Sequence, residues 1–134
     1  MNSTDAIPSF LAGDVFAVAG ASTERHKYGN KVLRCYLQND RTAYPVNPHA
    51  EVVEGVAAYS TLQDLPETVH GLSIITPPEI TEKIVEDAIQ AGIQHIWMQP
   101  GAENEASVAS AEQAGINVIA GGPCILVVMG FREE

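Results

Sequence analysis

Long apolar segments are absent from this chain of 134 residues, and so are closely spaced cysteines and histidines. No run approaches the roughly 20 apolar residues that a membrane-spanning helix needs, so we expect no membrane association. The first dozen residues lack the basic and apolar regions of a secretory signal. Cys35 and Cys124 form no C-x-x-C pair, which favours a reducing, cytoplasmic environment. The four histidines lack metal-ligand spacing, and we expect no metal site.

Positive charge is scarce as well. The formal net charge is −10, which disfavours a general nucleic-acid binder. Five of the seven basic residues nevertheless lie within one stretch of 17 positions: Arg25, Lys27, Lys31, Arg34 and Arg41. This concentration beside a glycine turn predicts an anion site, and a solvated helix face is the alternative interpretation.

Short segments rich in Val and Ile alternate with amphipathic segments. Strands are expected at 14–19, 42–46, 71–75, 95–98 and 117–120. Helices are expected at 29–38, 77–91 and 104–114, with a short helical turn at 60–64. Thr76 and Glu79 have the spacing of a capping box, with Pro77 at the first helical position. Asn104 is the expected cap of the next helix.

The alternation predicts one α/β domain over residues 1–134, with an ordered core at about 10–130. We expect a doubly wound, Rossmann-like, five-stranded or slightly larger parallel sheet with helices on both faces, in the order 3-2-1-4-5. Ligands of such sheets bind beyond the carboxyl ends of the strands. In this chain those positions hold small, polar, Gly or Pro residues, which either shape a ligand crevice or serve as turns.

A dinucleotide is the first candidate ligand for this fold, and two features disfavour NAD. The chain lacks G-x-G-x-x-G, since the next glycine after Gly20 is Gly29. The second strand ends in Val46-Asn47-Pro48, with no carboxylate to hold ribose hydroxyls. A neutral edge near basic residues suits a ligand with a phosphate on its ribose. Coenzyme A (CoA) and NADP both meet that description.

The segments VAGASTERHKYGNKVLR, YPVNP, ITPPE, MQPGAENE and the late GPC resemble those of small CoA-binding proteins, and more distantly the CoA-binding domain of the succinyl-CoA synthetase alpha subunit. The resemblance covers residues 14–124 and implies a Rossmann-type CoA site. It implies that Gly20, Ala21 and Ser22 hold pyrophosphate oxygens. The expected binding residues are Gly20, Ala21, Ser22, Arg25, Lys27, Tyr28, Gly29, Val46, Asn47, Pro48, Thr76, Pro77, Pro78, Gln99, Pro100, Gly101 and Cys124.

No complete catalytic constellation is visible in the sequence. Ser22 lacks a G-x-S-x-G elbow and reads as a cap or phosphate ligand. Cys124 is interpreted as a buried structural thiol, or as one that contacts or forms a disulfide with the thiol of CoA. We therefore expect a non-catalytic domain that binds CoA or acyl-CoA. Open alternatives are a subunit of an acyl-CoA synthetase or transferase active only with a partner, an NADP-binding domain, and a plain interaction module. The apolar residues 125–129 leave open a covered sheet edge or a homodimer contact.

Overall fold

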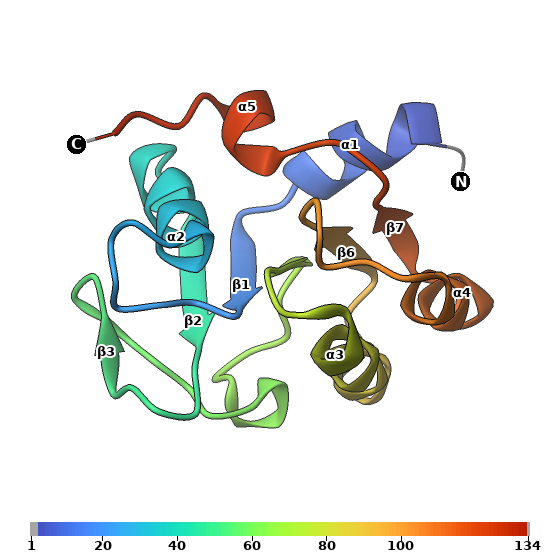
Figure 1. Cartoon of the computed structure of the whole chain (residues 1–134), viewed down its shortest axis with the longest axis horizontal. Helices are drawn as coiled ribbons and strands as arrows, with labels where there is room; N and C mark the ends of the chain where they lie inside the picture. Colours follow the sequence, from blue (N-terminus) through green and yellow to red (C-terminus); the bar gives the residue numbers. More distant parts are fainter. Residues whose placement is uncertain (1–2, 134) are drawn as a thin grey trace.

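A parallel sheet forms the centre of the molecule (Figure 1). The computed structural model describes residues 3–133. The five strands of this sheet are β1 (Val15–Ala19), β2 (Thr42–Val46), β5 (Gly71–Ile74), β6 (His95–Met98) and β7 (Asn117–Ile119). Every neighbouring pair is parallel. All five expected strands are thus confirmed, each end within one residue of its expected position.

The helices that connect the strands also agree with the sequence pattern. They are α2 (Tyr28–Gln38), α3 (Pro78–Ala91), α4 (Glu105–Gln113) and the short 3-10 helix η1 (Leu62–Asp64). The α4 cap is a complete capping box between Asn104 and Ser107. The expected box at the start of α3 is wrong: Pro77 is the N-cap, no side chain caps the helix, and the Thr76 hydroxyl pairs with that of Thr81.

Three elements have no counterpart in the sequence prediction. They are α1 (Ser3–Leu11), α5 (Ile125–Met129), and the antiparallel hairpin of β3 (Val52–Val53) and β4 (Val56–Ala57). α1 carries Pro8 in its interior, which argues against a helix on local grounds. Burial compensates, because Ala6 and Phe10 are almost completely buried.

Helices cover both faces of the sheet, as expected for a doubly wound fold (Figure 1). Phe16 and Val18 of β1 face the layer of α1, α2 and α5. Ala17 and Ala19 face the opposite layer of α3, α4 and η1. This alternation follows from the two-residue period of a strand. α5 packs against α2, and its first residue, Ile125, is buried in the same core as Phe16 and Val18.

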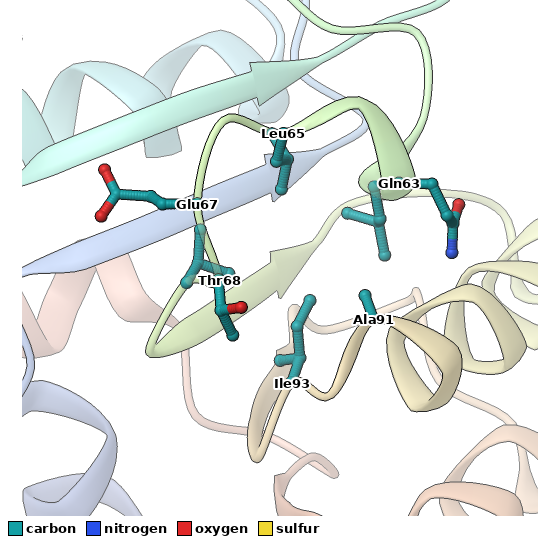
Figure 2. A pocket seen from close by; sticks show the side chains of 8 residues that line it. Gln63, Leu65, Glu67, Thr68, Ala91 and Ile93 are labelled. Atoms are coloured by element: carbon teal, nitrogen blue, oxygen red, sulfur yellow. The ribbon is translucent and has the colours of Figure 1, made fainter.

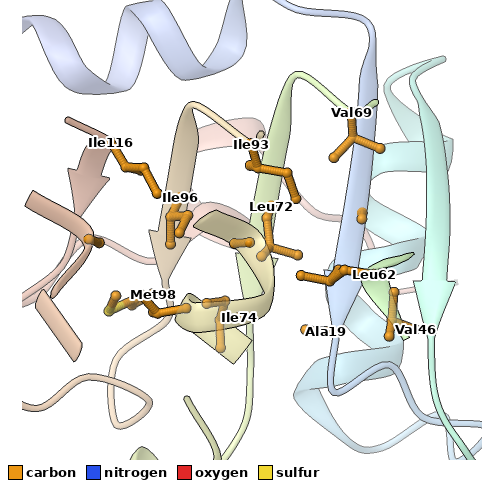
Figure 3. Close-up of a cluster of buried hydrophobic side chains, with 14 of the residues drawn as sticks. Ala19, Val46, Leu62, Val69, Leu72, Ile74, Ile93, Ile96, Met98 and Ile116 are labelled. Carbon is orange, nitrogen blue, oxygen red and sulfur yellow. The ribbon is translucent and has the colours of Figure 1, made fainter. Parts of the chain in front are cut away.

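The two apolar cores differ in content. Figure 3 shows the core beneath α3, where Leu72, Ile74, Ile96 and Met98 are fully buried. Each such side chain contributes about 1.5–3 kcal/mol on burial. The other core is aromatic and contains Trp97, whose indole N–H donates to the carbonyl of Pro123 at 3.0 Å. Trp97 itself is fully buried.

The expected strand order is wrong. In chain order the strands run second, first, third, fourth, fifth, because β5 pairs with β1 instead of lying outside β2. The outer edge of β2 is already occupied: Tyr59 forms a bridge with Val46, and its N–H donates to the carbonyl of Pro45. The third strand therefore pairs on the free side of β1. The change of direction in strand order, where this fold class binds ligands, lies between the ends of β1 and β5.

Tyr36→Phe should destabilise the fold, because α2 and β5 are joined by a buried hydrogen bond between the hydroxyls of Tyr36 and Ser73 at 2.6 Å. The substitution leaves the Ser73 hydroxyl buried without its partner, at a cost of about 1–3 kcal/mol in unfolding free energy. Urea denaturation measures the loss. The double variant Tyr36→Phe/Ser73→Ala should recover part of it. Equal losses in the single and double variants would contradict this role.

Candidate functional site

Two glycines let three elements meet at the carboxyl edge of the sheet. Gly20, which follows β1, has a φ of +91°, and a Cβ there would lie 2.2 Å from the carbonyl oxygen of Ile75. Gly29, in the first turn of α2, lies against Gly20: a Cβ there would be 1.9 Å from the Gly20 carbonyl oxygen. The start of α2 is thereby pressed against the ends of β1 and β5.

The N-terminus of α2 is the main electropositive feature of this edge. Lys27 is its N-cap residue and provides no side-chain cap, so the helix start has no internal anion from that position. The first amide groups of any α-helix have no partner further back in the helix, and the helix dipole favours negative charge there. Ala21 is buried, and the Ser22 hydroxyl accepts a hydrogen bond from the Glu24 N–H at 3.0 Å. The turn can thus present backbone donors to an anion.

The five clustered basic residues do not form one cluster in space. Arg41 donates to the carbonyls of Leu11 and Gly13, which precede β1 at the opposite end of the sheet. Arg34 is buried, and its Nε donates to Asn30 at 2.7 Å. Arg41 therefore does not contribute to an anion site at the glycine turn, because its side chain holds a loop at the far end of the sheet.

The two basic residues of the glycine loop each have an acidic neighbour. The Lys27 ammonium pairs with Glu24 at 2.9 Å, and this hydrogen bond lowers the pKa of the Glu24 carboxyl. The Arg25 Nε lies 3.7 Å from a carboxylate oxygen of Glu54. The side chains of Arg25 and Lys27 are more than half exposed. Both can therefore turn toward a bound ligand.

Residues after β2 hold the glycine turn in place. The Asn47 amide donates to the carbonyl of Ala21 at 2.9 Å, while its oxygen accepts from the N–H of His49. Val46 is buried and Pro48 is exposed. Asn47 therefore ties the end of β2 to the loop after β1, and this structural role explains why an amide stands there.

A small cavity of about 250 Å³ brings together residues from four expected segments. Its lining residues are Tyr28, Ile75, Gln99, Pro100 and Cys124. Gln99 is buried: its oxygen accepts from the Ile125 N–H at 2.8 Å, and its amide donates to the Cys124 sulfur at 3.3 Å. Four of the five lining residues were expected from the sequence. Ile75 was not, although it follows β5 directly.

Four further expected residues follow β5 and β6 directly in the chain. Thr76 and Pro77 follow β5, and Pro78 begins α3. Gly101 follows β6, and its N–H donates to Glu103. Thr76 and Gly101 therefore follow the ends of β5 and β6, which are neighbours in the observed strand order but not in the expected one.

The two cysteines differ in environment. Cys35 is buried in α2, and this burial raises its pKa to about 11. Cys124 is partly exposed and lines the cavity. The interpretation of Cys124 as a fully buried structural thiol therefore does not fit its exposure.

Another cavity lies at the far end of the sheet. It has a volume of about 310 Å³ between η1 and the end of α3, where Leu65 and Ile93 point toward one another (Figure 2). None of the expected binding residues lines it.

Within residues 3–133, no three His, Cys, Asp or Glu side chains gather as metal ligands would. Among the helices described, none has the length and apolar character needed to cross a membrane.

Two side chains that matter at this edge have no signal in the local sequence pattern. Asn30, completely buried in the first turn of α2, donates to the Ser22 carbonyl at 2.8 Å and to Glu54 at 3.0 Å. Glu54 comes from the tip of the β3–β4 hairpin. The second strand ends without a carboxylate, but the hairpin brings that of Glu54 to the first turn of α2, beside the glycine loop.

Comparisons with known proteins agree with this geometry. A family model described as a CoA-binding domain matches residues 14–130. The chain is 27% identical over 115 residues to ADP-forming acetate–CoA ligase I of Archaeoglobus fulgidus, covering 78% of this chain and 17% of that protein. It is 28% identical over 81 residues to the alpha subunit of ADP-forming acetate–CoA ligase II of Pyrococcus furiosus, covering 60% of this chain and 18% of that one. The chain thus spans less than a fifth of the length of either ligase protein.

The solved structures support the same fold. A conserved hypothetical protein from Pyrococcus furiosus superposes with a TM-score of 0.80 at 34% identity, covering 84% of this chain and 97% of that one. This similarity over nearly the whole of a solved chain confirms the doubly wound, Rossmann-like architecture.

Gly29→Ala should destabilise the protein, because it disrupts the contact between α2 and the glycine turn. In an exposed helix Ala is more favourable than Gly by about 1 kcal/mol, but here the new methyl would meet the Gly20 carbonyl oxygen at 1.9 Å. We expect a net loss of about 2 kcal/mol or more in unfolding free energy, measured by urea denaturation. The control is Gly92→Ala, which has a positive φ but open space around it and should lose about 1 kcal/mol. A neutral or stabilising Gly29→Ala would contradict the close contact.

Proposed function

This chain belongs to the family of CoA-binding domains, and we propose that it binds coenzyme A or an acyl-CoA at the carboxyl edge of its sheet. The pyrophosphate of the ligand lies over the turn of Gly20, Ala21 and Ser22. The observation that supports this placement is the contact of Gly29 with Gly20, which aims the N-terminus of α2 at that turn. Backbone amides at a helix N-terminus are a common phosphate site.

The nucleotide end of the ligand lies toward β2. Asn47 and Pro48 flank the adenosine, while Arg25, Lys27 and Tyr28 close over it from the glycine loop. Exposed cations on a loop can exchange acidic neighbours for phosphate oxygens at little conformational cost. This arrangement favours ligands with several phosphate groups.

The pantetheine end reaches toward the cavity lined by Gln99, Pro100 and Cys124. The space is apolar on the Ile75 side and lies beside Tyr28, the first residue of α2. A chain that starts at the glycine turn and passes Tyr28 enters this cavity. Thr76, Pro77 and Pro78 border it on one side, and Pro100 and Gly101 on the other.

Binding, rather than catalysis, is the activity we propose for this chain by itself. The Cys124 thiol accepts a hydrogen bond from the Gln99 amide, which is not a base and cannot take a proton from it. The Ser22 hydroxyl is engaged by a backbone N–H. A role as a subunit in acyl-CoA synthesis is the second candidate, favoured by the similarity to the acetate–CoA ligases. Turnover only in the presence of a partner chain would distinguish it.

Calorimetry with CoA, dephospho-CoA, NAD and NADP tests the ligand. CoA should bind most tightly, and removal of its ribose phosphate should weaken binding by about 1 kcal/mol or more, the scale of one charged hydrogen bond. Lys27→Gln should weaken CoA binding severalfold. Lys83→Gln removes the same charge from an exposed pair on α3 and should leave binding unchanged. Binding of NAD as tight as that of CoA would refute the proposal.

Alkylation of Cys124 tests whether the pantetheine end of the ligand lies beside this thiol. The buried Cys35, with its pKa raised to about 11, should stay unmodified near pH 8, so labelling reports Cys124. Acetyl-CoA has no free thiol to consume the reagent. At about 100 times its Kd it leaves roughly 1% of the protein free, and labelling should slow by up to about a hundredfold.

The matched control ligand is adenosine 3′,5′-bisphosphate, which has no pantetheine and should not protect. Mass spectrometry of the labelled protein locates the modification. Equal protection by both ligands, or by neither at saturation, would place the thiol end elsewhere.

A further inference from the structure

The tip of the β3–β4 hairpin carries an acidic residue in an unfavourable backbone conformation. Val53 pairs with Val56, so the turn consists of Glu54 and Gly55 alone. Both have positive φ, +50° and +77°, which is the pattern of a type I′ turn. Asn, Asp and Gly are the residues that suit the first position of this turn. Glu is disfavoured there by backbone strain, which its contacts must offset.

Those contacts are made at the proposed phosphate site. The Glu54 carboxylate accepts a hydrogen bond from Asn30 at 3.0 Å and lies 3.7 Å from the Arg25 Nε. The same Asn30 amide group donates to the Ser22 carbonyl at 2.8 Å. One amide therefore connects the hairpin tip directly to the glycine turn.

The electrostatics of Glu54 resemble those of a bound anion. Its side chain is 23% exposed, and it stands at the first turn of α2 beside a guanidinium. A helix N-terminus and an adjacent Arg are the partners that a phosphate group uses. Partial burial also strengthens its repulsion of a second negative charge.

We infer that Glu54 is a specificity-determining residue, whose carboxylate occupies in the free protein a position that a ligand phosphate must take beside Arg25. This inference rests on the proposed function and adds an internal competitor to it. A phosphate that binds at Arg25 displaces Glu54 from the guanidinium and from Asn30. Ligands without a phosphate at that point keep the Glu54 contacts and pay no such cost.

Glu54→Gln and Glu54→Asn test the inference. Gln keeps an oxygen for the Asn30 hydrogen bond and removes the charge. Asn also removes the charge and suits the positive φ, so we expect the relief of backbone strain to offset the contacts that the shorter side chain gives up. Calorimetry should show CoA binding strengthened by about threefold or more in both variants, the scale of one partly exposed ion pair. Glu51→Gln, an exposed residue preceding the same hairpin, is the matched control and should change nothing.

Arg25→Gln tests whether Arg25 is the partner for which Glu54 and the ligand phosphate compete. In this background the gain from Glu54→Gln should shrink, because the two anions then have less to compete for. An unchanged CoA affinity in Glu54→Gln would overturn the inference. So would a weaker affinity, which would make Glu54 an acceptor for ligand hydroxyls.

Inorganic pyrophosphate separates this inference from the function on which it rests. If CoA fails to bind the parent protein while pyrophosphate binds the variants more tightly, CoA binding is refuted and the competition stands. If CoA binds the parent and both variants equally, the function stands and the competition is refuted.

Discussion

The contact between Gly20 and Gly29 is the constraint on which the rest of this edge depends. Neither position has room for a Cβ, because the backbone of α2 lies directly on the turn after β1, and that turn lies on the end of β5. The start of α2, the turn after β1 and the end of β5 therefore meet at one place. The helix dipole, the Asn30 amide and the cavity beside Tyr28 all take their positions from it. Two missing side chains therefore build the site more directly than any charged residue does.

The sheet could be predicted from the sequence to a large extent, because strand positions follow from local apolar patterns. Its order could not be read from those patterns, although one residue carries relevant information. Pro45 has no N–H and fits an edge strand, which the second strand is in the observed order and is not in 3-2-1-4-5. The Tyr59 backbone then covers that edge. The strand order depends on which strand edge remains free for pairing. Segments that are distant in sequence determine which edge that is.

The candidate site shows the same contrast between local patterns, which can be read from the sequence, and contacts between distant segments, which cannot. Strand ends meet at one edge in any parallel sheet, so Gly20, Asn47, Thr76 and Gln99 could be placed together from the sequence. Side-chain partners could not, because they depend on where long connections return. Glu54 reaches Asn30 across 24 positions, and Arg41 leaves its basic neighbours for the far end of the sheet. Proximity in sequence predicted neither contact.

The charge of the whole protein is a poor guide to its ligand. At physiological ionic strength, interactions between exposed charges fall off over about 8 Å, so most of the formal −10 is screened from the glycine turn. The charged side chains close to the turn therefore matter most. There, Arg25 lies beside Glu54, and Lys27 lies beside Glu24. In the proposed binding mode, a phosphate would therefore replace a carboxylate at each cation instead of meeting an unpaired charge. Such an exchange gains less free energy than binding to an unpaired cation, because a contact is lost for each one formed. The first amide groups of α2 have no partner further back in the helix, so the proposed site draws on them as well as on the two cations.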